Sequence, residues 1–232
     1  MNAVFKIYKT LYEIYGMQGW WPLCGIGYHK GDYSYPKTED EIFEVCLGVI
    51  LTQNTSFGSV EKSLENLRKL NCLNHEKIKN MPLEQLKDAI KPSGYFNQKS
   101  DYILNFIEFF QRCDIPTREE LLNIKGIGPE SADSILLYGY AQKEFVVDTY
   151  TKRIFANLGL ISENAKYNEI KKVLVDGLKD KRELLKIYQE FHALIVAHAK
   201  RFYSKKPYGK GCPLASMLKK HAKQIGQKTI NA

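Results

Sequence analysis

One aspartate stands in an apolar setting that favours chemistry. Asp148 follows Phe145-Val146-Val147 and precedes the helical pattern TYTKRIF. Partial desolvation strengthens the interaction of a carboxylate with positive charge that develops beside it. Such a carboxylate can stabilise a cationic transition state at a sugar carbon and can orient an attacking water. Asp148 also suits the cap of the following helix, and the two roles are compatible because a cap holds the side chain rigid.

A glycine-rich turn comes shortly before this aspartate. Residues 124–129, IKGIGP, join the short helical pattern TREELLN, capped by Thr117, to the next helical pattern. Gly126 and Gly128 can adopt backbone angles that other residues avoid, and they can leave main-chain N–H groups facing outward. With the helix that starts at Pro129, those donors suit a phosphate oxygen. The alternative is an ordinary turn between two helices.

The composition describes a globular chain with an excess of positive charge. Among 232 residues, 34 Lys and Arg outnumber 26 Asp and Glu, and the net charge of +8 favours a polyanionic partner such as nucleic acid. No run approaches the ~20 apolar residues of a membrane helix, and no secretory leader is recognisable at the N-terminus. We therefore expect an intracellular monomer without a membrane partner.

The cysteines and histidines predict little chemistry. The five cysteines are widely spaced and form no CxxC pair, so they indicate reduced thiols and no complete metal site. His192 and His198 lie six residues apart, which is not the spacing of shared ligands on one helical face. We expect both histidines to have packing or surface roles.

Helical periodicity recurs along the chain and strand alternation does not persist, so the predicted fold class is all-α. Thr38 and Glu41 have the spacing of a capping box. The expected helices cover 38–52, 57–70, 82–90, 97–112, 129–141, 147–158, 166–178 and 183–203. We expect a helical bundle over 38–142 that ends in a helix-hairpin-helix at 117–141. Residues 1–37 and 143–232 would form a second layer, with a ligand site in the cleft between the layers.

From about Trp20 to Pro213 the chain resembles the endonuclease III superfamily of DNA glycosylases. The resemblance rests on Lys125-Gly126-Ile127-Gly128-Pro129, on the helix SADSILLYGYA, and on the approach Phe145-Val146-Val147-Asp148. It implies a two-layer fold with its active site in the cleft, a catalytic Asp148, and double-stranded DNA with a damaged base as partner. It also implies that the hairpin binds the DNA backbone, through Lys125, Gly126, Ile127, Gly128 and Glu130.

Two further segments look like DNA contacts of this superfamily. In LGVILTQNTSFGSV, Gln53, with or without Asn54, would fill the gap left when the damaged nucleotide leaves the stack. The alternative is a polar helix end. In PSGYFNQK, Lys99 is a candidate phosphate contact, and a solvated lysine is the default alternative.

Two departures from the superfamily carry predictions. The lysine with which strand-cutting members form a Schiff base is Glu130 here, and a carboxylate cannot do amine chemistry. We expect a monofunctional enzyme, although Lys125 nearby leaves weak strand cleavage open. The loop YSKKPYGKGCPL resembles the one that holds a four-cysteine iron-sulfur cluster, yet only Cys212 is present. We therefore expect no cluster and no other cofactor or metal; the other three positions are Phe202, Gly209 and Leu218.

The segment QGWWPLCG points to a lesion class. Trp20, Trp21 and Pro22, together with Phe57, resemble the 3-methyladenine branch of the superfamily. An alkylated purine carries positive charge, so stacking it between rings such as Trp20 and Phe57 adds a cation-π contribution of ~0.5 to 2 kcal/mol. The favoured substrate is therefore an alkylated purine, 3-methyladenine above others. The alternatives are core packing of these rings, an endonuclease III-like glycosylase and lyase for oxidised or mismatched bases, and a non-catalytic DNA-binding module.

Overall fold

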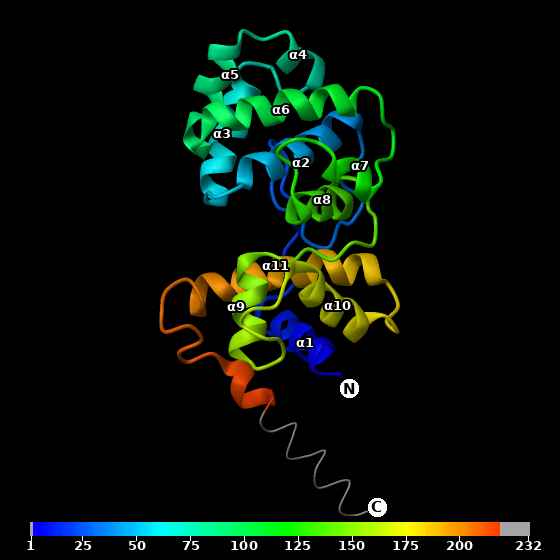
Figure 1. Ribbon diagram of the computed structural model, residues 1–232, viewed down its shortest axis with the longest axis vertical. Coiled ribbons are helices and arrows are strands. Elements are labelled where there is room, and N and C mark those ends of the chain that lie inside the picture. Colours follow the sequence, from blue (N-terminus) through cyan, green and yellow to red (C-terminus); the bar gives the residue numbers. More distant parts are fainter. Residues whose placement is uncertain (1, 219–232) are drawn as a thin grey trace, which may run out of the picture. The chain divides into compact units, whose positions relative to one another are not determined.

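The structure, a computed structural model, describes residues 2–218, and their regular secondary structure is helical (Figure 1). The one extended pairing among them is an isolated antiparallel bridge between Leu23 and Gly27. The all-α prediction is confirmed. The helices are α1 (Ala3–Tyr15), α2 (Glu39–Thr52), α3 (Phe57–Lys69), α4 (His75–Lys79), α5 (Leu83–Ile90), η1 (Lys91–Ser93), α6 (Phe96–Phe110), α7 (Arg118–Leu122), α8 (Pro129–Ser134), η2 (Ile135–Gly139), α9 (Thr149–Asn157), α10 (Tyr167–Leu178) and α11 (Leu184–Phe202).

The chain forms two compact units. Among the described residues, the hairpin unit is Gly19–Glu144, and the terminal unit consists of residues 2–18 and 145–218. The predicted division, 1–37 with 143–232 against 38–142, therefore differs at its first boundary. The segment 19–37 joins the hairpin unit because the Cys24 main-chain N–H donates to the Glu44 carboxylate of α2 and because the Trp21 ring packs on α2.

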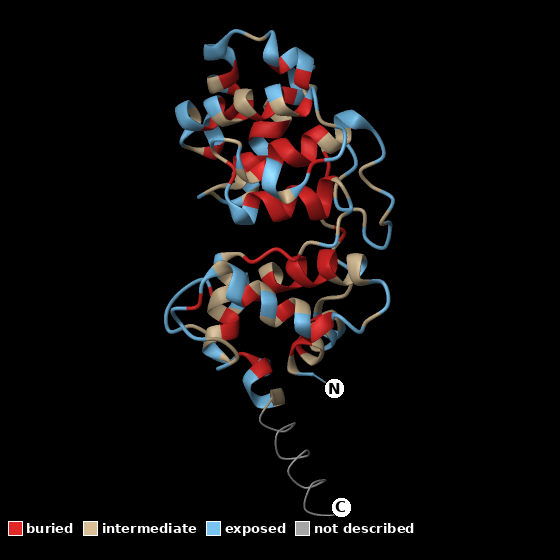
Figure 2. Cartoon of the chain, turned by 45° about the vertical axis from the view of Figure 1, so that its right-hand side comes forward, coloured by how far each residue is buried: buried red, intermediate tan, exposed pale blue. Residues whose placement is uncertain are grey.

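Helix α2 is the centre of the hairpin unit. Its N-terminus carries the predicted capping box, in which Thr38 and Glu41 bond each other's backbone N–H groups. Every residue from Phe43 to Leu51 is buried, in agreement with an apolar pattern all round the helix (Figure 2). Helices α3, α6 and α8 and the turn η2 pack on α2. The hairpin and the aromatic segment therefore sit on one buried support.

The terminal unit is built from α1, α9, α10 and α11. Helix α1 packs on both α10 and α11, and α11 also packs on α9. The contact of α1 with α10 depends on Gly177, because a Cβ there would lie 2.6 Å from the Cβ of Val4. Asp148, the N-cap of α9, belongs to this unit.

The helices differ from the prediction at several points, of which two bear on the hairpin unit. The helix expected over 129–141 is α-helical only from Pro129 to Ser134 and then continues as the π-helical turn η2. The short helix α4 was not predicted, because five residues are too few to show a period. None of the described helices has the length and apolarity required to cross a membrane.

Candidate active site

The two carboxylate oxygens of Asp148 have different surroundings in the structure. Its Oδ1 accepts the main-chain N–H of Thr151 at 2.6 Å and the Thr151 hydroxyl at 2.7 Å. The preceding residues Phe145, Val146 and Val147 are buried. The cap thus fixes the carboxylate while Oδ2 accepts no hydrogen bond within the described chain. Capping and chemistry can therefore coexist at this residue.

His192 is a site residue that the sequence did not reveal. Its Nε2 lies 3.9 Å from Asp148 Oδ2, and it is buried on α11. Burial lowers the pKa of His192, and the nearby Asp148 charge opposes that shift. The expectation of a packing or surface role missed this neighbour, because 44 positions separate the two residues and no local pattern links them.

The hairpin leaves main-chain donors exposed where a phosphate could approach. Residues 123–128 connect α7 to α8, and in this turn Ile127 N–H donates to the Ile124 carbonyl. The N–H groups of Gly126 and Gly128 have no acceptor within the described residues. Lys125, Gly128 and Glu130 are exposed, as a DNA-facing turn requires. The side chain of Ile127 is buried and anchors the turn.

Only one of the two glycines is required by its backbone. Gly126 has φ +101, and a Cβ there would lie 2.2 Å from Cγ of Tyr102 on α6. Gly128 has φ −94 and ψ 179, an extended conformation that any residue adopts, and a Cβ there would meet nothing within 4 Å. Of the two glycines that could adopt such angles, only Gly126 does so.

A buried ion pair joins the two helices of the hairpin. Arg118 Nε of α7 lies 2.7 Å from Oδ1 of Asp133 of α8, and Asp133 is fully buried. The Asp133 charge is thereby matched inside the hairpin and does not face the exposed glycine N–H groups. Breaking a buried pair of this kind costs a few kcal/mol, so the pair holds the turn in one geometry.

Gln53 is bound to the hairpin. Its Nε2 donates to the Gly126 carbonyl at 2.8 Å and lies 3.2 Å from the Ser131 hydroxyl. Insertion into DNA would require these bonds to break. Asn54 is exposed, with φ 54, and makes no such contact. Of the two predicted wedge residues, Asn54 is therefore the one available at the surface.

Lys99 requires a correction, because it is neither solvated nor placed to bind phosphate. Its side chain is 2% exposed, and its Nζ donates to the carbonyls of Leu51 and Ser93 at 2.7 Å each. Burial lowers the pKa of Lys99 to about 8. The ammonium thus links the last turn of α2 to η1. This burial could not be predicted from the sequence, since lysine side chains are usually exposed.

The aromatic residues of the 20–22 segment form a packed cluster with Phe57. The Trp20 and Phe57 ring centroids are 4.5 Å apart, and Trp21 contacts both Phe57 and Tyr138 of η2. Pro22, the next residue in the sequence, is also buried. Because Trp20 and Phe57 touch, no base can lie between them in this arrangement; the expected sandwich is not formed. The indole N–H groups of Trp20 and Trp21 are buried without an acceptor in the described chain.

Glu44 holds this aromatic segment against α2. The Cys24 N–H donates to it, and one helical turn later Gly48 lies so close to the Trp21 ring that a Cβ would be 2.9 Å from Nε1. Glu44 is 7% exposed, and burial raises its pKa to about 7. A carboxyl group with that pKa takes up or releases its proton near neutral pH.

Glu44→Gln is expected to flatten the dependence of stability on pH between about 4.5 and 7. The folded pKa lies above the unfolded value, so the folded protein binds more protons in this range and wild-type stability falls as pH rises. The contribution is at most about 3.4 kcal/mol, from roughly 2.5 pKa units at 1.36 kcal/mol each. Urea unfolding at several pH values measures it. Equal slopes in both proteins would contradict the assignment, and the exposed Glu84→Gln serves as control.

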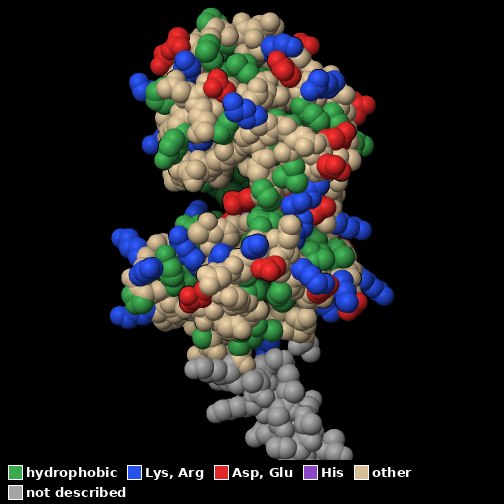
Figure 3. Space-filling view, viewed as in Figure 1, with side chains coloured by type: hydrophobic (Ala, Val, Ile, Leu, Met, Phe, Trp, Pro, Cys, Tyr) green, Lys and Arg blue, Asp and Glu red, His purple; other side chains and the backbone are tan. Residues whose placement is uncertain are grey.

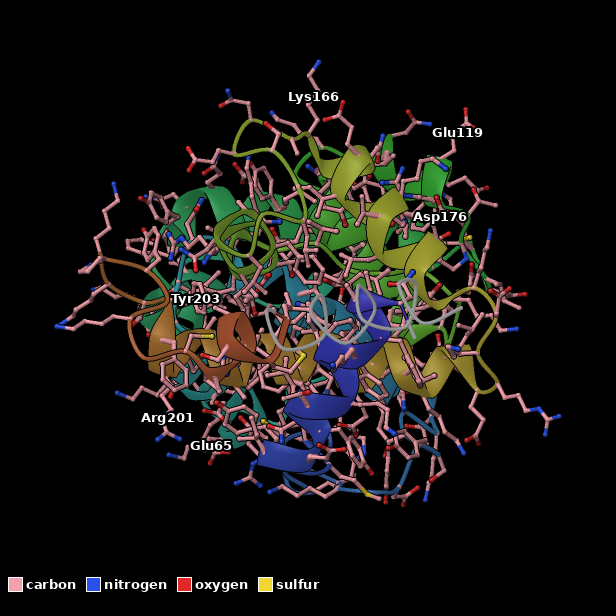
Figure 4. All side chains as sticks on the ribbon, turned by 90° about the horizontal axis from the view of Figure 1, so that it is seen from below. Glu65, Glu119, Lys166, Asp176, Arg201 and Tyr203 are labelled. Carbon is pink, nitrogen blue, oxygen red and sulfur yellow. The ribbon has the colours of Figure 1, made fainter. Side chains whose placement is uncertain are left out.

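The end of α11 and the loop after it carry exposed basic side chains. Lys200 and Arg201 in the last turn of α11 are exposed, and so are Lys205, Lys206 and Lys210 in the following loop. Figure 3 shows Lys and Arg side chains in blue on one face of the molecule. Figure 4 shows Arg201 toward the outside of the view and Tyr203, which is fully buried, nearer its middle. This charge gives the terminal unit a surface suited to a polyanion.

The residues at the four positions that correspond to iron-sulfur ligands do not form a ligand set for such a cluster. Cys212 Sγ lies 3.1 Å from His198 Nε2 and accepts the Tyr203 hydroxyl at 3.3 Å. At Gly209 a Cβ would lie 2.5 Å from Oδ1 of Asn157, so a cysteine there has no room. Phe202 and Leu218 offer no ligand. No group of three or more His, Cys, Asp or Glu in residues 2–218 is arranged to hold a metal ion.

Residues 47–179 match the family profile described as HhH-GPD superfamily base excision DNA repair protein. That span contains the hairpin and Asp148. The chain belongs to this superfamily. It therefore has the fold of the DNA glycosylases of base excision repair, and it acts on DNA.

Individual relatives agree with this assignment. A protein of Methanocaldococcus jannaschii that carries the name of a DNA repair glycosylase is 41% identical over 227 residues, covering 92% of this chain and 94% of that protein. Endonuclease III of Sulfolobus acidocaldarius is 28% identical over 193 residues, covering 79% and 84%. Relatives thus extend along nearly the whole chain.

Solved structures give the same fold. The H. pylori 3-methyladenine DNA glycosylase MagIII, bound to 1,N6-ethenoadenine, has a TM-score of 0.67 and 28% identity, covering 87% of this chain and 98% of that one. A trapped endonuclease III–DNA covalent intermediate has a TM-score of 0.71 at 17% identity, covering 92% and 94%. The predicted superfamily and its fold are confirmed.

Proposed function

We propose that the protein is a monofunctional DNA glycosylase that removes alkylated purines, 3-methyladenine above others, from double-stranded DNA. The main support is the position of the Asp148 carboxylate. Its Oδ1 is fixed by Thr151, and its Oδ2 lies near His192. Rupture of the base–sugar bond leaves positive charge on the sugar, and a preorganised carboxylate stabilises it. The enzyme acts as a monomer.

The choice of lesion follows from charge and from aromatic surface. An N-alkylated purine is a cation whose bond to the sugar is already weak, so its departure needs little help from a general acid. Trp20 and Tyr28, whose centroids are 5.8 Å apart, and Phe57 provide ring faces at the surface of the aromatic cluster. A cationic base stacks on such faces more strongly than a neutral one. The likeness to MagIII supports the same class of substrate.

Absence of an amine at position 130 supports hydrolysis without strand cleavage. The exposed residue there is Glu130, which cannot form a Schiff base. A second candidate, an endonuclease III-like glycosylase and lyase, is favoured by the exposed Lys125 on the same turn and by the relatives named endonuclease III. We also propose that no iron-sulfur cluster is bound, because one thiol cannot replace four.

DNA contacts are proposed for both units. In the hairpin unit, the N–H groups of Gly126 and Gly128 would bind backbone phosphate, and Asn54 would occupy the space vacated by the extruded nucleotide. In the terminal unit, the basic loop after α11 would add phosphate contacts.

Chromatography of bases released from methylated genomic DNA tests the lesion class. We expect 3-methyladenine to be the main product, and we expect duplexes with an oxidised pyrimidine or 8-oxoguanine to yield no free base. Trp20→Leu should slow release of the cationic 3-methyladenine by about 3- to 30-fold more than release of neutral hypoxanthine, the equivalent of ~0.5 to 2 kcal/mol. The exposed Tyr95→Leu, at the start of α6, is the control. Preferential release of an oxidised base would contradict the proposal and favour the second candidate.

A further inference from the structure

The candidate active site contains a second group that could take part in hydrolysis. Asp148 Oδ2 and His192 Nε2 are 3.9 Å apart, too far for a direct hydrogen bond. A single water oxygen can lie about 2.8 Å from both atoms at this separation. The two side chains are therefore placed to hold one water molecule jointly.

The positions of both atoms are set by packed helices. His192 follows Phe191, whose ring contacts Phe145 and Phe155, and α9 packs along α11. Asp148 is fixed by its cap on Thr151. A catalytic pair needs this kind of rigidity, since misplacement by about 1 Å costs as much as 100-fold in rate.

Both groups must be deprotonated before the reaction, the carboxylate as an anion and the imidazole as a neutral ring. If Asp148 accepted the proton of the attacking water, it would lose the charge that stabilises the sugar cation. If His192 were protonated beforehand, its charge would oppose the cation that forms. Burial disfavours that imidazolium, because it lowers the pKa of His192. A neutral imidazole beside an ionised carboxylate is the combination that hydrolysis needs.

We propose that His192 is the general base of the hydrolytic step, while Asp148 remains ionised and stabilises the sugar cation. This inference rests on the proposed glycosylase function. As the base–sugar bond breaks, its electron pair goes to the alkylated purine, which leaves as a neutral base. The water oxygen bonds to the sugar carbon, its proton passes to His192 Nε2, and the imidazolium later returns that proton to solvent.

Polar and charged groups from α1, α9 and α11 lie near His192. On its own helix, Tyr188, Gln189 and Glu190 are buried neighbours in sequence. On the neighbouring helix α9, Asp148 lies at the N-terminus. On α1, the Tyr8 ring contacts the Phe191 ring, and burial and the Glu190 charge both raise the pKa of Tyr8. Burial raises the pKa of Tyr8 to about 12, so Tyr8 stays neutral at the pH values of the assay. Asp148 is the charged group that acts on His192 from a packed element.

Single-turnover release of 3-methyladenine from a defined duplex tests this role in His192→Gln. Glutamine can bind a water but cannot accept its proton, so we expect the rate constant to fall at least about 100-fold with unchanged affinity for abasic DNA. The wild-type rate should decline below the ordinary histidine pKa near 6.5, and the variant should lack that decline. His198→Gln, a buried histidine of the same helix, should keep the wild-type rate and profile.

Two results would overturn the proposal: a His192→Gln rate within threefold of wild type, or an unchanged acid decline in that variant. If the variant does not fold, NMR titration of labelled histidine in the wild-type enzyme decides, because the His192 pKa must coincide with the midpoint of the decline. Failure of the glycosylase function itself is distinguishable, since the wild-type enzyme would then release no base from any lesion.

Discussion

Asp148→Asn is expected to abolish base release while leaving the protein folded. The change removes the negative charge and keeps the shape. Loss of one preorganised group that stabilises transition-state charge costs about 100- to 1000-fold, and Asp148 is the main such group here, so we expect at least about a 1000-fold loss, or roughly 4 kcal/mol. Single-turnover kinetics on a duplex with one 3-methyladenine measure it.

Asparagine also allows the two roles of this residue to be separated. Its side-chain oxygen can still accept the Thr151 N–H, and asparagine caps helices as well as aspartate does. The melting temperature and the affinity for abasic DNA should therefore stay at wild-type values. Asp176→Asn, which removes an exposed carboxylate from α10, is the control for a general charge effect. Release by Asp148→Asn within tenfold of wild type would show that the residue is only a cap.

Substitution of the two hairpin glycines by alanine should have contrasting effects. Gly126→Ala forces an L residue to φ +101 and places a methyl group against the Tyr102 ring. Backbone strain and overpacking together should lower the free energy of unfolding by about 2 to 5 kcal/mol. Chemical denaturation gives this value, and DNA affinity should fall with the loss of the turn.

Gly128→Ala should change the DNA affinity of the turn without changing the stability of the protein. The backbone there is extended and no atom lies within 4 Å of the added Cβ, so stability should change by less than about 0.5 kcal/mol. The methyl group would nevertheless stand beside the exposed N–H groups. We expect DNA to bind about tenfold more weakly, as seen by fluorescence anisotropy at fixed salt. Wild-type affinity in this variant would mean that phosphate does not contact the turn here.

The sequence predicted the features that are encoded locally. The capping box of Thr38 and Glu41, the buried period of α2, and the turn at Gly126 each depend on residues a few positions apart. Asp148 could be found because its apolar approach and the helix after it are contiguous. Such signals survive without knowledge of tertiary contacts.

The sequence could not reveal contacts between distant segments. Gln53 turns to a carbonyl 73 positions away, and Lys99 finds the carbonyl of Leu51, 48 positions away. From the sequence alone, both residues are expected at polar surface positions. The placement of 19–37 with the hairpin unit depends likewise on Glu44, whose buried carboxylate binds Cys24. His192 belongs to the same class.

The central claim is that this chain hydrolyses the base–sugar bond of an alkylated purine and leaves the strand whole. The most direct measurement uses one duplex with a single 3-methyladenine, from which free base and strand breaks are quantified together, with borohydride present in a parallel reaction. We expect stoichiometric release of free base, strand breakage only after alkali, and no covalent protein–DNA adduct. Strand breakage without alkali accompanied by a borohydride-trapped adduct, or no release of base at all, would contradict it.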